Sequence, residues 1–181
     1  GQSQQQAEQA SWDFNRSFGR MIARVNRAPQ VVITLLEGAV LGGGFGLACS
    51  SDVAIADKNA KFAMPETGLG IIPAQIAPFV VSRIGLTQAR RFALLGERID
   101  GEEAKAIGMV HYLTYGPEQM QAQLEAVLKK VRRCAPQANA VTKQLMLAVG
   151  QVELEQLLDR AADDFTASLR GDEGQEGTQA F

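Results

Sequence analysis

Apolar residues between Ala7 and Arg27 recur at spacings of three and four, with polar residues between them, which predicts an amphipathic helix. Pro29 follows and ends this helix. The next run, VVITLLE at 31–37, is short and rich in β-branched residues, which predicts a strand buried on both faces. A glycine block, GAVLGGGFG, interrupts that strand at Gly38, and the LACSS after it is typical of a helix.

Residues 52–113 predict an alternation of short strands and helices. DVAIA and KFAM predict two strands separated by a polar turn, and the Gly- and Pro-rich stretch from Pro65 to Pro78 predicts mainly loop. FVVSRIG and LTQARRFALLG then predict two helices, each ended by a glycine. Asp100, with a glutamate three positions later, predicts the cap of a short helix, and MVHYL at 109–113 predicts a final strand.

The last part of the pattern, residues 117–170, predicts three helices separated at Ala135-Pro136 and around Gly150. Strand signals therefore concentrate before residue 115 and helix signals after it. Buried strands joined through helices predict an α/β core, and the helical remainder predicts a packing or assembly element.

The composition is that of one globular domain of ordinary size. The chain has 181 residues, 46% of them hydrophobic, with 18 basic against 20 acidic residues and a formal net charge of −2. This balance gives no long-range field to capture nucleic acid or an anionic membrane. One basic cluster is better explained as a solvated helix face than as a contact with nucleic acid or a phosphorylated ligand. It consists of Lys129, Lys130, Arg132 and Arg133.

Cysteine and histidine are too few for several classes of site. Cys49 and Cys134 lack CxxC spacing, so we predict neither a disulfide framework nor a zinc site, and a reducing compartment is the simpler assumption. The single histidine, His111, excludes a site with several imidazole ligands and is expected to be structural. No apolar run is long enough to span a bilayer, and the polar start does not resemble a signal peptide. We therefore expect a cytoplasmic protein with no membrane partner.

The segment EGAVLGGGFGLA, residues 37–48, takes a predicted strand through a glycine turn into a helix. The first N–H groups of such a helix have no acceptor within it and lie at the positive end of its dipole, which suits an anion or a developing oxyanion. The spacing fits neither a Walker phosphate loop nor a GxGxxG fingerprint. Taken alone, the glycines are better explained as serving only a tight turn.

The segment KFAMPETGLGIIP, residues 61–73, places one acid, Glu66, among apolar and glycine residues. Apolar surroundings desolvate a carboxylate and fit it for general acid–base catalysis. Taken alone, Glu66 is better explained as a surface loop residue. The apolar residues after it, such as Leu69 and Ile71, are candidates for lining an apolar ligand pocket, and packing of the following helix explains them equally well.

The two segments together change this interpretation. The run EGAVLGGGFGLACSSDVAIADKNAKFAMPETGLGIIP, followed by RIGLTQARRFALLGERIDGEEAKAIGMVH, resembles the crotonase, or enoyl-CoA hydratase/isomerase, superfamily. The resemblance implies a ββα spiral core in residues 1–115 and a helical trimerisation region in residues 116–181, and hence a homotrimer or a dimer of trimers. It also implies a coenzyme A thioester as substrate, with no prosthetic group and no metal.

The resemblance assigns roles to specific residues. It gives Gly43 a backbone N–H that holds the thioester oxygen. It puts two glutamates at the reactive carbons of hydratases, and the second of them matches Glu66. The first matches Gly46, where this chain departs from the hydratase pattern. The residues expected around the substrate are Gly42, Gly44, Gly46, Leu69 and Ile71.

Three functions fit this departure. The stretches GFGLACSSDVAIA and PETGLGIIPAQIAPFVVSRIGLTQARR look most like hydratases of acyclic terpene breakdown, which act on isohexenylglutaconyl-CoA, also called γ-carboxygeranoyl-CoA. This is the interpretation that we favour. A single glutamate is also similar to the pattern of the family's Δ3,Δ2-enoyl-CoA isomerases. The third alternative is a noncatalytic assembly or binding subunit with the same fold.

The family pattern also extends upstream of Gly1, where it has further strands and the other oxyanion donor. The resemblance thus implies that these residues form the C-terminal two-thirds of the family fold. It predicts an incomplete coenzyme A site and little activity for a chain that begins at Gly1. It matches Phe181 to a family aromatic near the neighbouring subunit's coenzyme A.

Overall fold

The structure is a computed structural model, and it describes residues 2–180. Phe181, which the resemblance placed near coenzyme A, lies outside the described residues. The elements in chain order are α1 (Gln2–Asn26), β1 (Ile33–Leu36), β2 (Ala39–Leu41), α2 (Gly43–Ser50), β3 (Val53–Asp57), β4 (Lys61–Ala63), the 3-10 helix η1 (Glu66–Leu69), α3 (Ala77–Leu95), β5 (Arg98–Ile99), α4 (Gly101–Ala106), β6 (Tyr112–Thr114), α5 (Pro117–Val131), α6 (Pro136–Ala148), α7 (Leu154–Arg170) and α8 (Asp172–Ala180).

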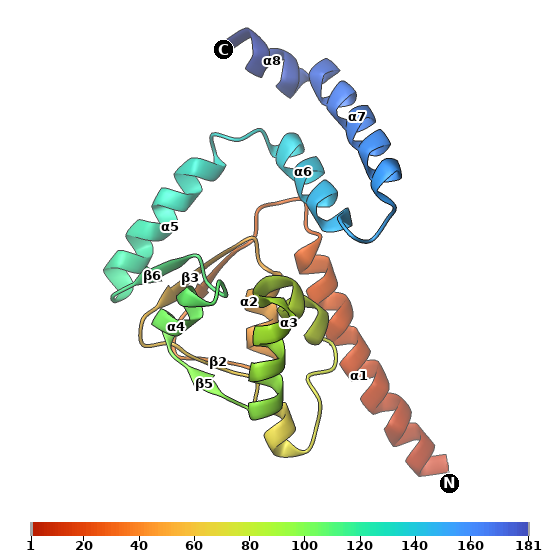
Figure 1. Cartoon of the computed structure of the whole chain (residues 1–181), viewed down its shortest axis with the longest axis vertical. Coiled ribbons are helices and arrows are strands. Elements are labelled where there is room, and N and C mark those ends of the chain that lie inside the picture. The colour runs from red at the N-terminus through yellow and green to blue at the C-terminus, as the bar shows by residue number, and fades with distance from the viewer. Residues whose placement is uncertain (1, 181) are drawn as a thin grey trace. The chain divides into compact units, whose positions relative to one another are not determined.

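Contacts divide the described chain into two compact units. The first contains the residues up to Asn26 together with Val32–Ala126, and the second contains Arg27–Val31 together with the residues from Val127 onward. All the strands belong to the first unit (Figure 1). The predicted α/β class is therefore confirmed, while the assignment of residues 116–181 to trimerisation stays a prediction.

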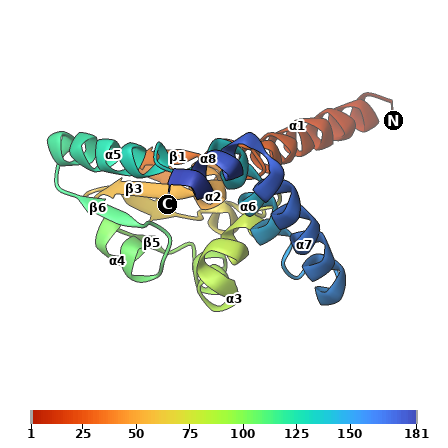
Figure 2. The same ribbon diagram turned by 90° about the horizontal axis from the view of Figure 1, so that it is seen from above.

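Two small sheets form the centre of the first unit. One is parallel, in the order β1-β3-β6, and the other has the order β2-β4-β5, with β2 parallel and β5 antiparallel to β4. Strand β3 is buried along its middle because Ala54, Ile55 and Ala56 are all enclosed. Figure 2 shows α3 and α4 on the same side of the β1-β3-β6 sheet.

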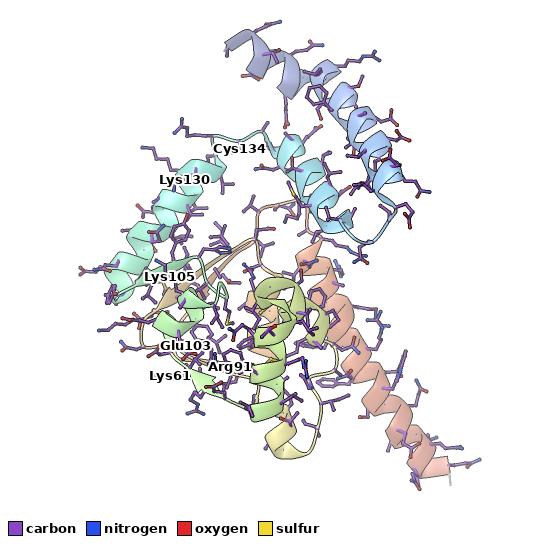
Figure 3. The ribbon with its side chains drawn as sticks, in the orientation of Figure 1. Lys61, Arg91, Glu103, Lys105, Lys130 and Cys134 are labelled. Carbon is purple, nitrogen blue, oxygen red and sulfur yellow. The ribbon has the colours of Figure 1, made fainter. Side chains whose placement is uncertain are left out.

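In the core of this unit, α2 packs against α3. Phe45 of α2 and Phe92 of α3 are fully buried, and their ring centroids lie 5.8 Å apart. Farther along, Arg91 pairs with Glu97 at 2.6 Å and with Glu103 of α4, toward which it points in Figure 3. Buried aromatic packing and these ion pairs hold α3 against its neighbours.

Glycine and cap signals gave correct boundaries for several elements. Gly85 interrupts α3 with φ 75° and ψ 161°, so the two predicted helices are real segments on either side of it. Gly96 ends the second segment with φ 58°. Asp100 accepts a hydrogen bond from the Glu103 N–H and caps α4, as its spacing predicted.

Other sequence predictions were wrong in detail. Strands β2 and β5 were not predicted, and α1 begins at Gln2 rather than Ala7. The strand predicted at 109–113 begins only at Tyr112. The reason is that the N–H groups of Met109 and Val110 both donate to the Ala104 carbonyl, which wraps this segment around the end of α4 instead of along β3.

The second unit contains three helices, α6, α7 and α8, and the end of α5. The Glu173 carboxylate accepts hydrogen bonds from the N–H groups of Gln137 and Ala138, and so caps the start of α6. Helix α7 leaves four large apolar side chains exposed on the face defined by spacings of four, seven and four. They are Leu154, Leu158, Phe165 and Leu169.

Candidate active site

The pairing of β2 with β4 brings the two candidate segments together. In this parallel pair Leu41 lies opposite Ala63. The next residue, Gly42, donates its N–H to the Ala63 carbonyl at 3.1 Å. The chain thus leaves both strands at the same edge of one sheet, toward Gly43 on one strand and toward Glu66 on the other.

Helix α2 begins with N–H groups that have no acceptor. Gly42 precedes it with φ 50° and ψ −115°, a conformation that glycine adopts without a steric penalty. The first bond within the helix runs from the Gly46 N–H to the Gly42 carbonyl at 3.0 Å. Within residues 2–180, the N–H groups of Gly43 and Gly44 meet no acceptor and the helix has no side-chain cap. Two donors therefore stand at the positive end of the helix dipole.

The carboxylate of Glu66 lies directly over this turn. A β-carbon placed on Gly42 would be 2.9 Å from Glu66 Oε1, so the carboxylate lies in close contact with this turn. Glu66 begins η1, and its carbonyl accepts the N–H of Ile71 at 3.1 Å. Thr67 Oγ1 donates to the Ala93 carbonyl at 2.7 Å and ties the turn to α3. The backbone that carries the carboxylate is therefore held on both sides.

One oxygen of this carboxylate has no partner. Oε2 of Glu66 is buried, and no donor for it exists in the part of the chain that the structure describes. Buried polar atoms are nearly always hydrogen-bonded in folded proteins. This carboxylate oxygen is therefore available to a group outside the described residues.

Comparison with known proteins identifies the family. The family model described as enoyl-CoA hydratase/isomerase matches residues 1–181. The chain belongs to this family. A solved structure of Pseudomonas aeruginosa AtuE is 55% identical, with a TM-score of 0.94 over 96% of this chain and 67% of that one. An enoyl-CoA hydratase/isomerase from Marinobacter aquaeolei is 59% identical, with a TM-score of 0.91 over 94% of this chain and 64% of that one.

Curated members of the family are longer than this chain. The mitochondrial methylglutaconyl-CoA hydratase of Mus musculus is 29% identical over 139 residues, which are 76% of this chain and 44% of the mouse protein. The chain spans less than two thirds of the length of the curated relatives that it matches. The predicted crotonase fold is nevertheless confirmed, because the close structural matches cover nearly all of this chain.

Gly46 is the position that the resemblance matches to the first glutamate of hydratases, and the structure shows which side chains surround it. Gly46 is buried. A β-carbon on it would lie 2.2 Å from Cγ2 of Ile76 and 3.5 Å from Cδ1 of Ile22. Apolar side chains thus fill the place in which a longer residue at position 46 would begin. Gly44, by contrast, faces open space, with nothing within 4 Å of a β-carbon there.

Helix α1 covers the first turn of α2, although its sequence pattern did not indicate a part in the site. Phe18 lies over Gly43, with its Cζ atom 2.8 Å from the position of a β-carbon on that glycine. Ile22, four residues later, is fully buried against the same helix. The spacing of Phe18 and Ile22 in the amphipathic pattern was the available signal, but nothing in it indicated which helix they face.

The two apolar candidates after Glu66 are exposed in the described structure. Leu69 is 72% exposed and Ile71 is 58% exposed, whereas Ile76 is buried against α2. Packing of the following helix therefore explains Ile76 but neither Leu69 nor Ile71. The structure thus brings Glu66 to the turn that contains Gly42 and Gly43. Gly44 faces open space next to this turn, whereas Gly46 is buried against Ile76.

Cys49 and His111 lie at the other end of α2. Burial raises the pKa of the Cys49 thiol to about 12, against the opposing effect of Arg83, so this thiol is neutral and a poor nucleophile. His111 Nδ1 accepts the Ala54 N–H at 2.9 Å. Partial burial, together with Arg83, lowers the pKa of His111.

Among residues 2–180, no group of three or more acidic, cysteine or histidine side chains is placed to hold a metal ion. No helix among them is long and apolar enough to cross a membrane.

Proposed function

We propose that the protein containing this chain is an enoyl-CoA hydratase that adds water to a branched 2-enoyl-CoA. The observation that carries the proposal is the placement of Glu66 over Gly42, beside the unpaired N–H groups of Gly43 and Gly44. This combination provides an acid–base group next to hydrogen-bond donors for an oxyanion. Family membership supports a coenzyme A thioester as the substrate.

In the proposed reaction, the oxygen of water bonds to C3 of the enoyl group. The electrons of the double bond move toward the thioester oxygen, which becomes an enolate oxygen held by the Gly43 N–H. Glu66 takes the proton from water and returns it to C2, giving a 3-hydroxyacyl-CoA. One donor of this kind contributes about 3–4 kcal/mol to a transition state in comparable sites.

For the substrate, we propose isohexenylglutaconyl-CoA and thus a role in acyclic terpene breakdown. The support is the resemblance of residues 45–56 and 65–91 to hydratases of that pathway. A second line of support is the mouse relative, whose name describes a hydratase of another branched glutaconyl thioester. A panel that compares isohexenylglutaconyl-CoA with straight-chain crotonyl-CoA tests this choice. Equal kcat/KM values for the two would contradict it.

Isomerisation is the second candidate, and the surroundings of Gly46 favour it. Ile76 and Ile22 fill the space at that position, so no second carboxylate stands there. A Δ3,Δ2-enoyl-CoA isomerase needs one base, which removes a proton from C2 of a 3-enoyl-CoA and returns it at C4. Glu66 meets that requirement alone.

Mass measurement separates the two reactions. The full-length protein is incubated with a 2-enoyl-CoA, and with its 3-enoyl isomer, in water enriched in oxygen-18. A hydratase incorporates the label into a heavier product, whereas an isomerase shifts the double bond and leaves the mass unchanged. An unlabelled product with a shifted double bond would reject hydration, and an unreacted substrate in both incubations would leave only the noncatalytic subunit.

We also propose that residues 116–181 form contacts between subunits of a homotrimer in the cytoplasm. The exposed apolar face of α7, with Leu154, Leu158, Phe165 and Leu169, supports such a contact because apolar patches of this kind on a protein surface usually mark an interface.

A further inference from the structure

Arg83 binds the carbonyl end of α2. Its Nη2 donates to the Ala48 carbonyl at 3.1 Å and to the Ser51 carbonyl, and its Nε donates to the Cys49 carbonyl at 3.3 Å. The same Nη2 lies 3.4 Å from Ser51 Oγ. One half-buried guanidinium therefore meets three backbone carbonyls at the last turn of the helix.

These contacts complete the helix at the end opposite the candidate site. The last carbonyl groups of an α-helix accept no hydrogen bond from an N–H group of the same helix, and they lie at the negative end of its dipole. The last turn of α2 contains no basic residue of its own. Arg83 supplies the cation from α3, and its planar fork matches several carbonyls at once in a way that a lysine ammonium does not.

The local conformation of α3 explains how Arg83 reaches these carbonyls. Arg83 lies two residues before Gly85, whose φ of 75° and ψ of 161° end the first segment of α3. That segment contacts α2 at both ends, with Ile76 against Gly46 and Arg83 against Ala48 and Cys49. The first segment of α3 therefore packs along α2 and contacts both of its ends.

Helix α2 is short enough for its two ends to move together. Its eight residues, from Gly43 to Ser50, span about 12 Å at 1.5 Å per residue. A rotation or shift at its last turn therefore reorients the N–H groups of Gly43 and Gly44 with respect to Glu66. Misplacement of a catalytic group by about 1 Å is enough to cost on the order of 100-fold in rate.

We propose that Arg83 is a positioning residue for the reaction, which fixes α2 by its carbonyl end and so aims the N–H groups of Gly43 and Gly44 at the thioester oxygen. The inference rests on the proposed function of that site. Arg83 itself touches neither substrate nor reacting atoms, and it acts through the helix.

The test uses the full-length protein with Arg83→Met and Arg83→Lys. Arg83→Met removes all the hydrogen bonds, and Arg83→Lys keeps the charge without the fork. We expect kcat to fall by about 10- to 100-fold in Arg83→Met, in line with partial loss of oxyanion donors, while KM changes by less than about twofold. We expect the kcat of Arg83→Lys to lie between those of the parent and Arg83→Met.

A matched control separates positioning from general stability. Ile99→Val removes one buried methyl group from β5, which pairs with β4 and not with α2, so it lowers the melting temperature and leaves kcat unchanged. Hydrogen exchange gives a readout that does not depend on turnover. Amides of residues 46–50, which follow the first hydrogen bond within α2, exchange faster in Arg83→Met than in Ile99→Val at equal loss of melting temperature.

The outcomes distinguish this inference from the proposed function. An active parent whose kcat is unchanged in Arg83→Met overturns the positioning role and leaves the function standing. Unchanged exchange of the amides of residues 46–50 does the same. A parent that turns over neither a 2-enoyl-CoA nor a 3-enoyl-CoA overturns the function and the catalytic part of this inference together. Equal losses of kcat in Arg83→Met and Ile99→Val overturn the positioning role as well, because stability then explains both.

Discussion

The glycines in the turn after β2 have different surroundings, although they lie within five positions of one another. Gly42 leaves space for the Glu66 carboxylate, Gly44 opens to free space, and Gly46 packs beneath Ile76. The sequence shows only that glycines cluster here, and the family resemblance implies only which position lacks a glutamate. The difference between them arises from α1 and from the segment before α3, which approach from distant parts of the chain.

Substitution of Gly46 tests this packing. A β-carbon there lies within 2.5 Å of both Cγ2 and Cβ of Ile76, so Gly46→Ala forces a buried branched side chain to move. We expect Gly46→Ala to lower the free energy of unfolding by about 1–3 kcal/mol, as overpacked cores do. Gly44→Ala is the matched control and should not lower the free energy of unfolding, because its added methyl group meets open space. Urea denaturation measures both.

A double variant checks the cause of that loss. If Ile76 is the obstacle, Ile76→Ala should remove most of the additional cost of Gly46→Ala, which a double-mutant cycle measures as a coupling energy. Additive effects of the two substitutions would show that position 46 is constrained by something else.

His111 predicts a pH dependence of stability at the residue scale. Partial burial and the nearby Arg83 lower the pKa of His111 in the folded protein, so the unfolded chain binds the proton more readily. The contribution of neutral His111 is fully present above its unfolded pKa of about 6.5, and it is lost as the pH falls below that value. Protonation also removes the acceptor for the Ala54 N–H.

The measurement is the midpoint of urea denaturation between about pH 7.5 and pH 5, above the range in which carboxylates titrate. We expect the midpoint to fall toward pH 5 in the parent and to be flatter in His111→Gln. An equal slope in both proteins would assign the dependence to other groups.

At the scale of elements, glycine and capping signals in the sequence predicted the helix ends that local conformation and local hydrogen bonds determine. Gly85, Gly96 and the Asp100 cap fixed helix ends because their conformations or hydrogen bonds involve only neighbouring residues. Strands β2 and β5 have three and two residues, and they exist because distant partners pair with them. The candidate site depends on the pairing of Leu41 with Ala63, so its residues were predicted only through the family resemblance.

The break in α3 provides a test at this scale. Gly85 has φ 75° and ψ 161°, a combination that is nearly restricted to glycine, whereas Gly96 has φ 58° and ψ 30°, which other residues adopt at a moderate cost. Gly85→Ala should therefore destabilise the protein by about 1–3 kcal/mol, and by more than Gly96→Ala does. Thermal denaturation of the two variants gives the order, and the reverse order would contradict the role of Gly85 in separating the two segments.

At the scale of the whole molecule, the apolar face of α7 is exposed in the described chain. Phe165 is 66% exposed and Leu158 is 53% exposed. If this face forms the proposed contact between subunits, Phe165→Glu places a charge in an apolar interface and should shift the protein from trimer toward monomer. Asp163→Asn, on an exposed position of the same helix, should leave the trimer intact. Sedimentation velocity of the full-length protein distinguishes the two.

In the mechanism that we propose, Glu66 carries out the proton transfers next to the N–H groups of α2. Turnover of isohexenylglutaconyl-CoA, and of its 3-enoyl isomer, by full-length Glu66→Gln tests it most directly, because the amide keeps the shape of the side chain and removes its acid–base function. Glu125→Gln, an exposed glutamate on α5 that accepts a hydrogen bond from Gln121, is the matched control. We predict that kcat falls by about 10²- to 10⁴-fold in Glu66→Gln and is unchanged in Glu125→Gln. Equal kcat values in Glu66→Gln and the parent would contradict the account.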